Sequence, residues 1–411
     1  MERRLLEIEE ARRAVLERVG ALRSERVSLE ESLGRVLAAD VVAPEAVPGF
    51  DNSAMDGFAV RAADTDGATA GAPALLRLVA ESRAGHPAEA ALGPGEAIAI
   101  STGAMVPSGA DAVVRVEDTG RGEAAVEVRA RVPAGANIRR AAEDVAEGEG
   151  VLAAGALIGP AEQGVLASAA CPLPSCVARP RVRVVVSGDE LIGAADPSRP
   201  GAVRDSNAYT VPALARAAGA EVASVARVGD DPVATRETIA QALESDLAVV
   251  CGGVSVGEHD HVRPALAELG AEQVFWGIAL RPGKPTWFGV VEGGGIAFGL
   301  PGNPVSAMVT FILFVRPALL AMQGREPAAE RATAILEEGY AKKPGRAHAV
   351  RCRLRAGEEG WLARPTKEQG SHVLTSMLGA DALAIIPTDS GDVAAGQRVT
   401  VELLRGPTMR A

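Results

Sequence analysis

The sequence predicts a multidomain protein that mixes α+β and α/β architecture, with an α/β domain built on a mostly parallel sheet. Its 411 residues exceed one ordinary core, and a size of about 150 residues per domain suggests roughly two to four domains. Between residues 182 and 323, buried apolar strands alternate with helical segments, which indicates parallel strands joined by right-handed crossovers. Before and after this region, short runs that alternate at period two indicate β-rich modules.

The N-terminal segment predicts two amphipathic helices. Apolar residues recur at helical spacing from Ile8 to Val19, which favours a first helix. Ser28 and Glu31 then stand in capping-box register ahead of a second apolar stripe that runs to Leu37. We therefore expect the chain to begin with two helices.

The later elements follow in order from the same patterns. The β-rich part has strands at 97–101, 111–117 and 125–132 and closes near residue 144. In the α/β part, the strands VRVVVS, EVASVARV and LAVVCGG precede helices from about Asn207, Pro232 and Asp260. IAFGL then leads through a turn into a long apolar helix that ends near residue 323. A final all-β module has its strands at RCRLRA, GWLARP, DALAIIP and QRVTVELL.

Composition and charge limit the partners. Acidic side chains outnumber basic ones by 53 to 42, a net charge of -11, which argues against nucleic acid or an anionic membrane as the main partner. The first residues are charged throughout, and no eighteen apolar residues run without interruption, so we expect a soluble cytoplasmic protein. Four cysteines are too few for a disulfide framework. Cys171 and Cys176 lack a second ligand pair for zinc, which favours small buried thiols.

Polar residues gather where the α/β strands end. Ligands of open α/β sheets bind beyond the carboxyl ends of the strands, where helix N-termini offer backbone N–H groups to anions. The junctions carry Asp189, Glu190, Asp230, Asp231, Gly252, Gly253, Ser255, Gly257, Glu258, Asp260, Arg281, Lys284, Gly299, Gly302, Asn303 and Ser306. Glycines let a ligand approach the backbone, serines and N–H groups bind phosphate oxygens, and carboxylates hold a hard cation such as Mg²⁺. The pattern predicts a phosphorylated ligand with a metal.

Other interpretations of these residues stay open. Asp230 or Asp231, ahead of Pro232, could equally be an ordinary helix N-cap. His259 and His261 could bind a transition metal, although without a third histidine nearby a solvated role is favoured. Neither GxxxxGK[ST] nor a GxGxxG after the first strand occurs. GxSxG and HExxH are also absent, so hydrolases built on those motifs have no support.

The stretch PGFDNSAMDGFAV at 48–60 places two aspartates at one strand entrance. Pro48, Gly49, Asn52 and Gly57 are ordinary turn chemistry. Turn formation does not explain Asp56, which stands directly ahead of the apolar strand.

These motifs together resemble the MoeA family of molybdopterin molybdenumtransferases, to which the E domain of gephyrin also belongs. The matching stretches occur in the family's order and are PGFDNSAMDGFAV, STGAMVP at 101–107, NIRRAAED at 137–144, SGDEL at 187–191, DSNAY at 205–209, GDDP at 229–232, GGVSVGEHD at 252–260, RPGKP at 281–285 and GLPGNPVSA at 299–307.

The resemblance implies a four-part fold and a homodimer. We expect a helical and extended domain at 1–43 plus 145–178, with a β-rich domain inserted at 44–144. An α/β molybdopterin-binding domain at 179–326 and a C-terminal β-barrel at 327–411 would follow. Family members form elongated homodimers whose active site lies between the α/β domain of one subunit and the β-domain of the other.

The resemblance also implies roles for individual residues. Asp56, Thr102 and Asp144 would be the β-domain's catalytic contribution, with Gly57 letting the backbone turn sharply behind Asp56. Glu190, Asp230 and Asp260 would be the acidic set of the α/β domain and the metal ligands. The residues expected to bind the substrate are Gly252, Gly253, Ser255, Gly257, Arg281, Lys284, Pro301, Asn303, Pro304 and Ser306.

Three positions depart from the family pattern. Arg281 replaces the usual lysine ahead of PGKP, Cys251 replaces a frequent serine before GGVSVG, and Ala142 replaces a frequent glycine. Arg281 keeps the charge but changes a compact ammonium into a planar fork, which leaves its ligand contact open.

The reaction that the resemblance implies is insertion of molybdate into adenylylated molybdopterin, with release of AMP. Mg²⁺ is the expected metal, because a divalent cation can polarise a phosphoryl bond. The upstream molybdopterin adenylyltransferase is an expected partner. The alternatives are a non-catalytic scaffold that binds molybdopterin or nucleotide, and an equivalent enzyme that inserts tungstate.

Overall fold

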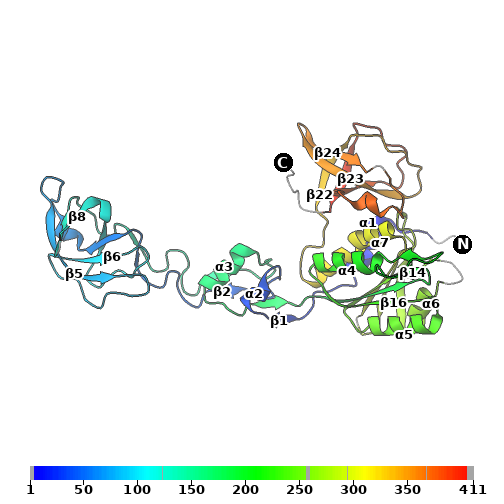
Figure 1. Cartoon of the computed structure of the whole chain (residues 1–411), viewed down its shortest axis with the longest axis horizontal. Coiled ribbons are helices and arrows are strands. Elements are labelled where there is room, and N and C mark those ends of the chain that lie inside the picture. Colours follow the sequence, from blue (N-terminus) through cyan, green and yellow to red (C-terminus); the bar gives the residue numbers. More distant parts are fainter. Residues whose placement is uncertain (1–3, 123, 256–259, 294, 367, 405–411) are drawn as a thin grey trace. The chain divides into compact units, whose positions relative to one another are not determined.

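The chain forms two compact units in the computed structural model, which describes residues 4–122, 124–255, 260–293, 295–366 and 368–404 (Figure 1). The first unit contains Met1–Glu25, Gly34–Val36 and Cys176–Ala411, and the second contains Arg26–Leu33 and Leu37–Ser175. The chain passes from one unit to the other near β1 (Ser24–Arg26) and β12 (Ser175–Val177).

A six-stranded sheet forms the centre of the first unit, in the order β16-β13-β17-β21-β20-β18. Its strands are β13 (Arg181–Ser187), β16 (Glu221–Val228), β17 (Leu247–Cys251), β18 (Ala271–Trp276), β20 (Trp287–Val291) and β21 (Ile296–Leu300). The first four in spatial order are parallel, whereas β20 and β18 are antiparallel to their neighbours. The predicted mostly parallel sheet is therefore confirmed.

Helices cover both faces of this sheet, as Figure 1 shows. They are α4 (Asn207–Ala217), α5 (Pro232–Ala242), α6 (Val262–Glu268), α7 (Pro304–Thr310), the π-helical η3 (Phe311–Val315) and α8 (Arg316–Met322). One face of β13 and β17 packs with α5 and α6, and the opposite face packs with α4 and the α7–α8 segment. Burial on both faces explains the continuous apolar runs of these strands.

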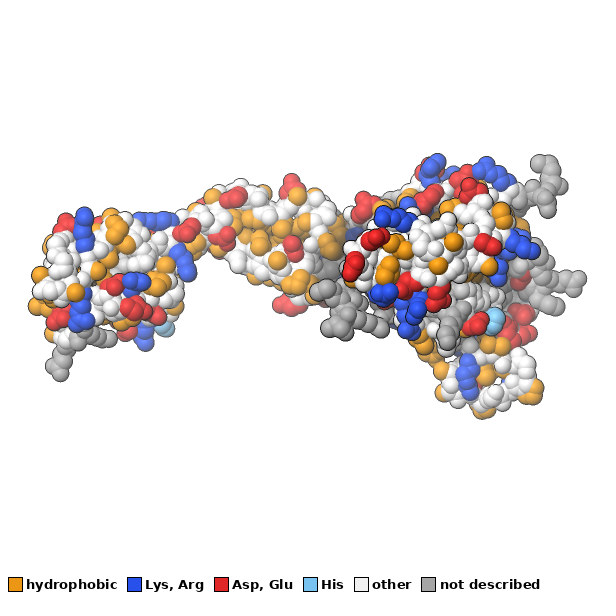
Figure 2. Space-filling model, turned by 90° about the horizontal axis from the view of Figure 1, so that it is seen from above, with side chains coloured by type: hydrophobic (Ala, Val, Ile, Leu, Met, Phe, Trp, Pro, Cys, Tyr) orange, Lys and Arg blue, Asp and Glu red, His pale blue; other side chains and the backbone are white. Residues whose placement is uncertain are grey.

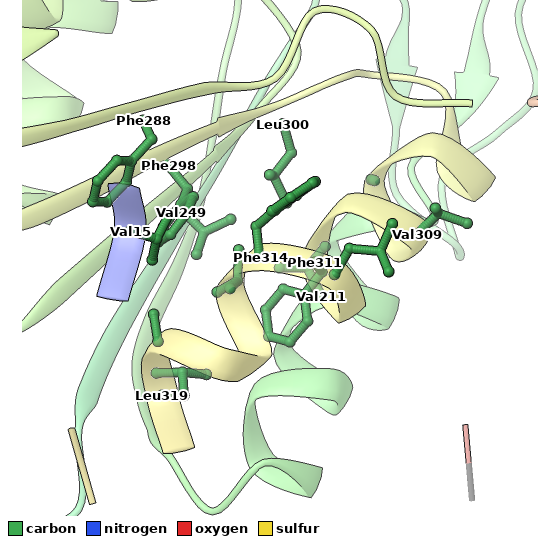
Figure 3. Packing of buried hydrophobic residues seen from close by; sticks show 14 of the residues in the cluster. Val15, Val211, Val249, Phe288, Phe298, Leu300, Val309, Phe311, Phe314 and Leu319 are labelled. Carbon is green, nitrogen blue, oxygen red and sulfur yellow. The ribbon is translucent and has the colours of Figure 1, made fainter. Parts of the chain in front are cut away.

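The larger core includes a helix from the chain's beginning. Val15 of α1 (Ile8–Leu16) lies in the cluster with Phe298 and Phe314, where the rings of Phe288 and Phe298 approach to 4.8 Å (Figure 3). The predicted first helix is thus confirmed, and it packs in the α/β core although the sequence had assigned residues 1–43 to the helical and extended part. Pro304–Met322 is long and apolar enough to cross a membrane, but 83% of its most apolar window is buried in this core.

The C-terminal part of the first unit is a closed barrel, as the family resemblance implied. Its strands are β22 (Arg331–Leu336), β23 (Ala347–Gly357), β24 (Gly360–Pro365), β25 (Ala382–Ile386) and β26 (Arg398–Leu403), with the short helix η4 (Leu374–Met377) before β25. They pair in the order β23-β24-β22-β26-β25, and pairing of β25 with β23 closes the ring. β19 (Leu280–Arg281) adds to β23 in parallel and so joins the barrel to the α/β part.

Outside the barrel, β14 (Leu191–Ile192) and β15 (Val203–Arg204) form a short parallel pair between β13 and α4.

A buried ion pair ties α1 to the barrel. Both guanidinium Nη atoms of Arg12 donate to the Glu402 carboxylate, at 2.7 and 2.6 Å. Arg12 is 8% exposed and Glu402 is 2% exposed. Arg12 Nε also donates to the Leu313 carbonyl at 3.0 Å, where the π-helical turn alters the regular backbone bonding.

The second unit contains a six-stranded sheet in the order β7-β4-β6-β5-β9-β8. The strands are β4 (Gly57–Val60), β5 (Ala74–Ser82), β6 (Glu96–Ile100), β7 (Ala112–Arg115), β8 (Thr119–Arg121) and β9 (Ala125–Val128). Alternate residues along β4 and β6 enter separate clusters on the two faces. The predicted strands within 97–132 are therefore confirmed.

The second unit also contains several smaller elements. They are α2 (Leu29–Ser32), β2 (Val41–Val42), β3 (Asn52–Ser53), η1 (Ala62–Thr65), η2 (Val116–Asp118), β10 (Ile138–Arg139), β11 (Gly150–Leu152) and α3 (Pro160–Ser168). The predicted second helix was wrong in length. Ser28 caps α2 through the Glu31 N–H, but Leu33 already leaves the helical conformation and Gly34 takes a positive φ of 74°.

Charged side chains of both signs lie at the surface (Figure 2), and the four cysteines are free thiols. Figure 2 shows acidic and basic side chains interspersed on the face in view. Each of the four cysteines is a free thiol; Cys176, Cys251 and Cys352 are buried and Cys171 is half-buried.

Candidate functional site

A cavity of about 850 Å³ lies at the carboxyl ends of the parallel strands in the first unit. We call it the rim cavity. Of the residues predicted from the sequence, its lining includes Glu190, Asp230, Gly252, Gly253, Ser255, Asp260, Pro301, Asn303 and Pro304. These residues come from four strand ends that are distant in sequence, and the parallel sheet brings them together because it places all four ends on one edge.

The two acidic residues in the loop after β13, Asp189 and Glu190, make different contacts. Asp189 Oδ1 accepts the backbone N–H of Asp230 at 3.0 Å, so Asp189 holds the neighbouring loop in place. The Glu190 carboxylate lies over Gly188, where any Cβ would stand 2.4 Å from Oε2. Gly188 therefore leaves the space that lets Glu190 line the rim cavity.

The neighbouring residues Asp230 and Asp231 also make different contacts. Asp231 is the N-cap of α5, and its Oδ1 accepts the Ala234 N–H at 2.7 Å. Asp230 lines the rim cavity. The structure therefore places the helix cap at Asp231 and places Asp230 in the lining of the rim cavity.

Two glycines after β17 are required by close packing. Gly252 has φ +92°, and a Cβ there would lie 2.5 Å from the Ser187 carbonyl oxygen. Gly253 has φ +64°, and its Cβ would lie 2.6 Å from a Val262 methyl group. Neither position accepts a side chain, so Gly252 and Gly253 present bare backbone to the rim cavity.

The rim cavity includes polar residues for which the sequence suggested no role. Asp205 is 3% exposed, accepts the Ala208 N–H at 2.9 Å and pairs with Arg227 at 3.1 Å. Asn207 donates to the Gly302 carbonyl at 2.8 Å, which links the start of α4 to the LPGNP turn. Both lie in the DSNAY stretch, so the motif located them without indicating what they do.

The barrel also contributes to the rim cavity. His372 and Leu374 line it, and the Val305 N–H donates to the Ser371 carbonyl at 3.1 Å. No local signal in the sequence pointed to His372, because only the docking of a barrel loop on the α/β part brings it there.

Among the described residues, three that were expected to bind the substrate do not line the rim cavity. Lys284 is exposed beside Pro285, which does line it, and Ser306 is buried in α7, where its carbonyl accepts the Thr310 hydroxyl. Arg281 lies elsewhere because it is the last residue of β19, a strand of the barrel sheet and not of the parallel sheet. Gly257, with Glu258 and His259, falls outside the described residues. His261 is the N-cap residue of α6 but makes no side-chain cap bond.

Arg281 lines a second cavity of about 780 Å³ whose other basic side chains are Lys342, Lys343, Arg346 and His348. We call it the basic cavity. Burial, with the charges of Arg281, Lys342 and Arg346, lowers the pKa of His348 to about 4. Its Nδ1 lies 3.0 Å from the Tyr340 hydroxyl. His348 is therefore neutral at pH 7, and the positive charge of this cavity comes from arginine and lysine.

The carboxylates of the rim cavity do not form a ready-made cage for a metal. Within the described ranges, no three His, Cys, Asp or Glu side chains lie close enough together to hold an ion. Mg²⁺ commonly uses one or two carboxylates and takes its remaining ligands from water and substrate phosphates. The oxygen donors of Glu190, Asp230 and Asp260 fit that mode of binding.

The second unit joins three of the sequence motifs into one loop surface. Asp56 Oδ1 accepts both the backbone N–H of Thr102 at 2.7 Å and its hydroxyl at 3.1 Å. Asp51 accepts the Arg140 guanidinium at 2.6 Å and the Ala141 N–H at 2.8 Å. That backbone bond and the guanidinium hold the pKa of Asp51 below its usual range. Sequence reasoning assigned no catalytic or binding role to Asp51 or Arg140.

The other predicted residues of this surface are exposed or explained by packing. Asp144 is exposed and its N–H donates to the Val47 carbonyl. The expected sharp turn at Gly57 was wrong: Gly57 begins β4, and a Cβ there would lie 1.9 Å from the Val114 carbonyl oxygen. Ala142 has φ 62°, the left-handed region that favours glycine.

Comparisons with known proteins cover nearly the whole chain. A model of the MoeA N-terminal region (domain I and II) matches residues 6–170, a probable molybdopterin binding domain matches 183–321, and the MoeA C-terminal region (domain IV) matches 333–404. Molybdopterin molybdenumtransferase 2 of Mycobacterium tuberculosis (strain CDC 1551 / Oshkosh) is 38% identical over 405 residues, with 96% of this chain and 98% of the relative covered.

Two further similarities agree with these. The molybdopterin molybdenumtransferase of Haemophilus influenzae is 34% identical over 404 residues, which cover 97% of this chain and 98% of that protein. The crystal structure of a molybdopterin biosynthesis MoeA protein from Pyrococcus horikoshii superposes with a TM-score of 0.82 at 31% identity, covering 98% of this chain and 100% of that one.

Proposed function

Because this chain belongs to the MoeA family of molybdopterin molybdenumtransferases, we propose that it inserts molybdate into adenylylated molybdopterin and releases AMP. Family membership makes it a transferase of molybdenum cofactor biosynthesis. The adenylylated substrate, the metal, the roles of single residues and the four domain boundaries given above belong to the proposal.

One observation carries the proposal. Glu190, Asp230 and Asp260 meet glycine-rich backbone in a single cavity at the rim of the parallel sheet. Bare backbone at Gly252 and Gly253 suits the close approach of phosphate oxygens. The carboxylates suit a hard cation that offsets the negative charge of both phosphate and molybdate.

In this proposal, each group of residues has a separate role. Glu190, Asp230 and Asp260 position the substrate, and one or two of these carboxylates would hold Mg²⁺ together with water and substrate oxygens. Ser255 and the turn around Asn303 bind the polar groups of the substrate. When bound, Mg²⁺ would supply Lewis-acid polarisation of a phosphoryl oxygen. Asp205 and Asn207 keep α4 and the LPGNP turn in register through the bonds described above. Arg281 in the basic cavity and Lys284 at the surface serve the anionic ends of the ligands.

We also propose that the working enzyme is a cytoplasmic homodimer with shared sites. Asp56, Thr102 and Asp144 lie in one unit of the chain and the acidic set lies in the other, and the family resemblance implies that two subunits complete each site. Mixing an inactive Asp56→Ala subunit with an inactive Asp260→Ala subunit should restore one working site per heterodimer. If no activity returns after demonstrated subunit exchange, the shared site is wrong.

The decisive assay is AMP release. Purified protein is incubated with adenylylated molybdopterin, Mg²⁺ and molybdate, and AMP is measured with and without each component. We expect release that depends on both molybdate and the cation, and that falls steeply in Asp260→Asn. Intact adenylylated substrate in the complete mixture would favour the non-catalytic scaffold instead.

The same assay addresses the metal that is inserted. Molybdate and tungstate are tetrahedral oxyanions of nearly equal size, so the lining of the rim cavity does not choose between them. Replacing molybdate by tungstate, and comparing the rates of AMP release, measures that preference directly. The upstream molybdopterin adenylyltransferase is the proposed source of the substrate.

A further inference from the structure

A third hollow, of about 230 Å³, lies in the first unit. We call it the helix pocket. Its lining comes from α4, from the α7–α8 segment and, on the barrel side, from Met377, Ala380 and Leu404. Within the described chain it shares no lining residue with the rim cavity or the basic cavity. The proposed reaction therefore gives this pocket no role.

One stripe of the long apolar helix faces the helix pocket. The side chains of this stripe recur every four residues and are Met308, Ile312, Arg316 and Leu320. Such spacing places side chains on one side of a helix. Arg316 is half-buried and is the one charged residue in Pro304–Met322. Its charge thus stands in an apolar surrounding, where it needs a partner to offset the cost of burial.

The end of the same helix brings a second arginine to the pocket. Gly324 has φ +70° and donates its N–H to the Ala321 carbonyl at 2.9 Å, and the Arg325 N–H donates to the Leu320 carbonyl at 2.9 Å. This pair of bonds is the Schellman motif, which ends a helix at a left-handed glycine. The turn fixes the backbone of Arg325, which lines the pocket together with Arg316.

The two arginines have no acidic partner among the described residues. The described lining of the pocket contains neither Asp nor Glu. Glu326, the acid next to Arg325 in the chain, accepts the Ala328 N–H at 3.0 Å instead. Burial and the charge of Arg316 both lower the pKa of Arg325, although a guanidinium stays protonated at pH 7. Two like charges therefore share a partly buried, apolar space without compensation.

We propose that the helix pocket binds a small amphipathic carboxylate, with its apolar chain against Phe311, Ile312 and Leu320 and its carboxylate between Arg316 and Arg325. Guanidinium groups match the geometry of a carboxylate and form charge-assisted hydrogen bonds with it. One such anion offsets the repulsion between the two arginines. The pocket is smaller than the roughly 300–1,000 Å³ of typical ligand pockets, which favours a short aliphatic chain. Binding here does not depend on the proposed reaction.

The test is a ligand-observed NMR titration of the full chain with hexanoate, hexanamide and hexylammonium, which have similar chains and differ in charge. Hexanoate should bind about tenfold or more tightly than hexanamide, because hydrogen bonds between charged groups exceed neutral ones. Hexylammonium should bind more weakly than either. Absence of hexanoate binding, or equal binding of hexanoate and hexanamide, would overturn the inference.

Substitutions assign the binding to this pocket. Arg316→Gln and Arg325→Gln should each reduce the preference for hexanoate, and the double variant should abolish it. Arg216→Gln removes an exposed arginine of α4 outside the lining and should keep the preference. Ala217→Leu adds bulk to the lining and should weaken hexanoate and hexanamide alike, whereas Ala213→Leu, exposed on the same helix outside the lining, should not. An unchanged preference in the double variant would place the anion elsewhere and refute the proposal.

A thermal melt separates ligand binding from a structural role of the arginines. Without ligand, Arg316→Gln and Arg325→Gln should each melt at or above the parental temperature, because each removes one of two uncompensated like charges. Hexanoate should raise the melting temperature of the parent but not that of the double variant. Lower melting temperatures for both ligand-free single variants would show that the arginines serve the packing of the fold, and would overturn the inference.

Discussion

Asp230 and Asp231 are neighbours in the chain with separate tasks, and substituting each in turn tests the proposed site. Asp231 caps α5 through the Ala234 N–H at 2.7 Å. Losing this cap in Asp231→Ala should cost about 1 kcal/mol, which lowers the melting temperature of a domain of this size by roughly 2–4 °C. Asp231→Asn keeps a capping oxygen and should melt like the parent. Both variants should retain molybdate-dependent AMP release.

Asp230→Asn should do the opposite. The Asp230 backbone N–H, which bonds to Asp189, is untouched, so stability should stay within about 0.5 kcal/mol of the parent. The rim cavity loses a carboxylate, however. The Mg²⁺ concentration for half-maximal AMP release should rise at least roughly tenfold, the smaller of the losses seen when a partner of a metal ligand is removed.

The two readouts are a thermal melt and a Mg²⁺ titration of AMP release on the same preparations. Parental Mg²⁺ dependence in Asp230→Asn would remove the metal role from Asp230. An inactive but fully folded Asp231→Ala would show that the separation between cap and site is wrong. Either result would require a different placement of the cation.

The remaining predictions concern packing. Gly57→Ala should destabilise the second unit by more than about 2 kcal/mol in urea unfolding, because its Cβ would overlap the Val114 carbonyl; an unchanged midpoint would contradict this. Ala142→Gly should stabilise the second unit by roughly 0.5–1 kcal/mol. The left-handed backbone costs alanine about 1–2 kcal/mol in the folded state, which exceeds the entropy that glycine adds to the unfolded chain. A lower urea midpoint for this variant would contradict the prediction. Arg12→Leu should cost about 3 kcal/mol near pH 7 by leaving Glu402 buried without its main partner. Burial raises the pKa of Glu402, but its bonds with Arg12 and Arg331 hold that pKa below the usual range. The parent therefore loses this stabilisation as the pH falls through the folded pKa. The difference in unfolding free energy between the parent and Arg12→Leu should thus narrow in acid.

The candidate site was predictable where its residues follow strands. Glu190, Asp230 and Asp260 could be grouped from the sequence because parallel strands place their carboxyl ends on one edge of a sheet. The same reasoning failed for Arg281, since β19 belongs to the barrel sheet. It could not find His372, which reaches the rim cavity only through docking of the barrel. Nor could it separate Asp230 from Asp231, because both fit the capping position until the φ and ψ of the loop are known.

The sequence by itself determined the local order of the molecule: the alternation of strand and helix, the glycines of the turns that follow the parallel strands, and the period-two strands of the β-rich parts. Each of these depends on residues a few positions apart, where backbone geometry and side-chain periodicity act directly. The tertiary structure alone decided that α1 packs in the α/β core, that β25 closes the barrel on β23, and that Arg12 meets Glu402. Those contacts join segments far apart in the chain, and their free energy depends on burial and charge pairing that exist only after the chain has folded.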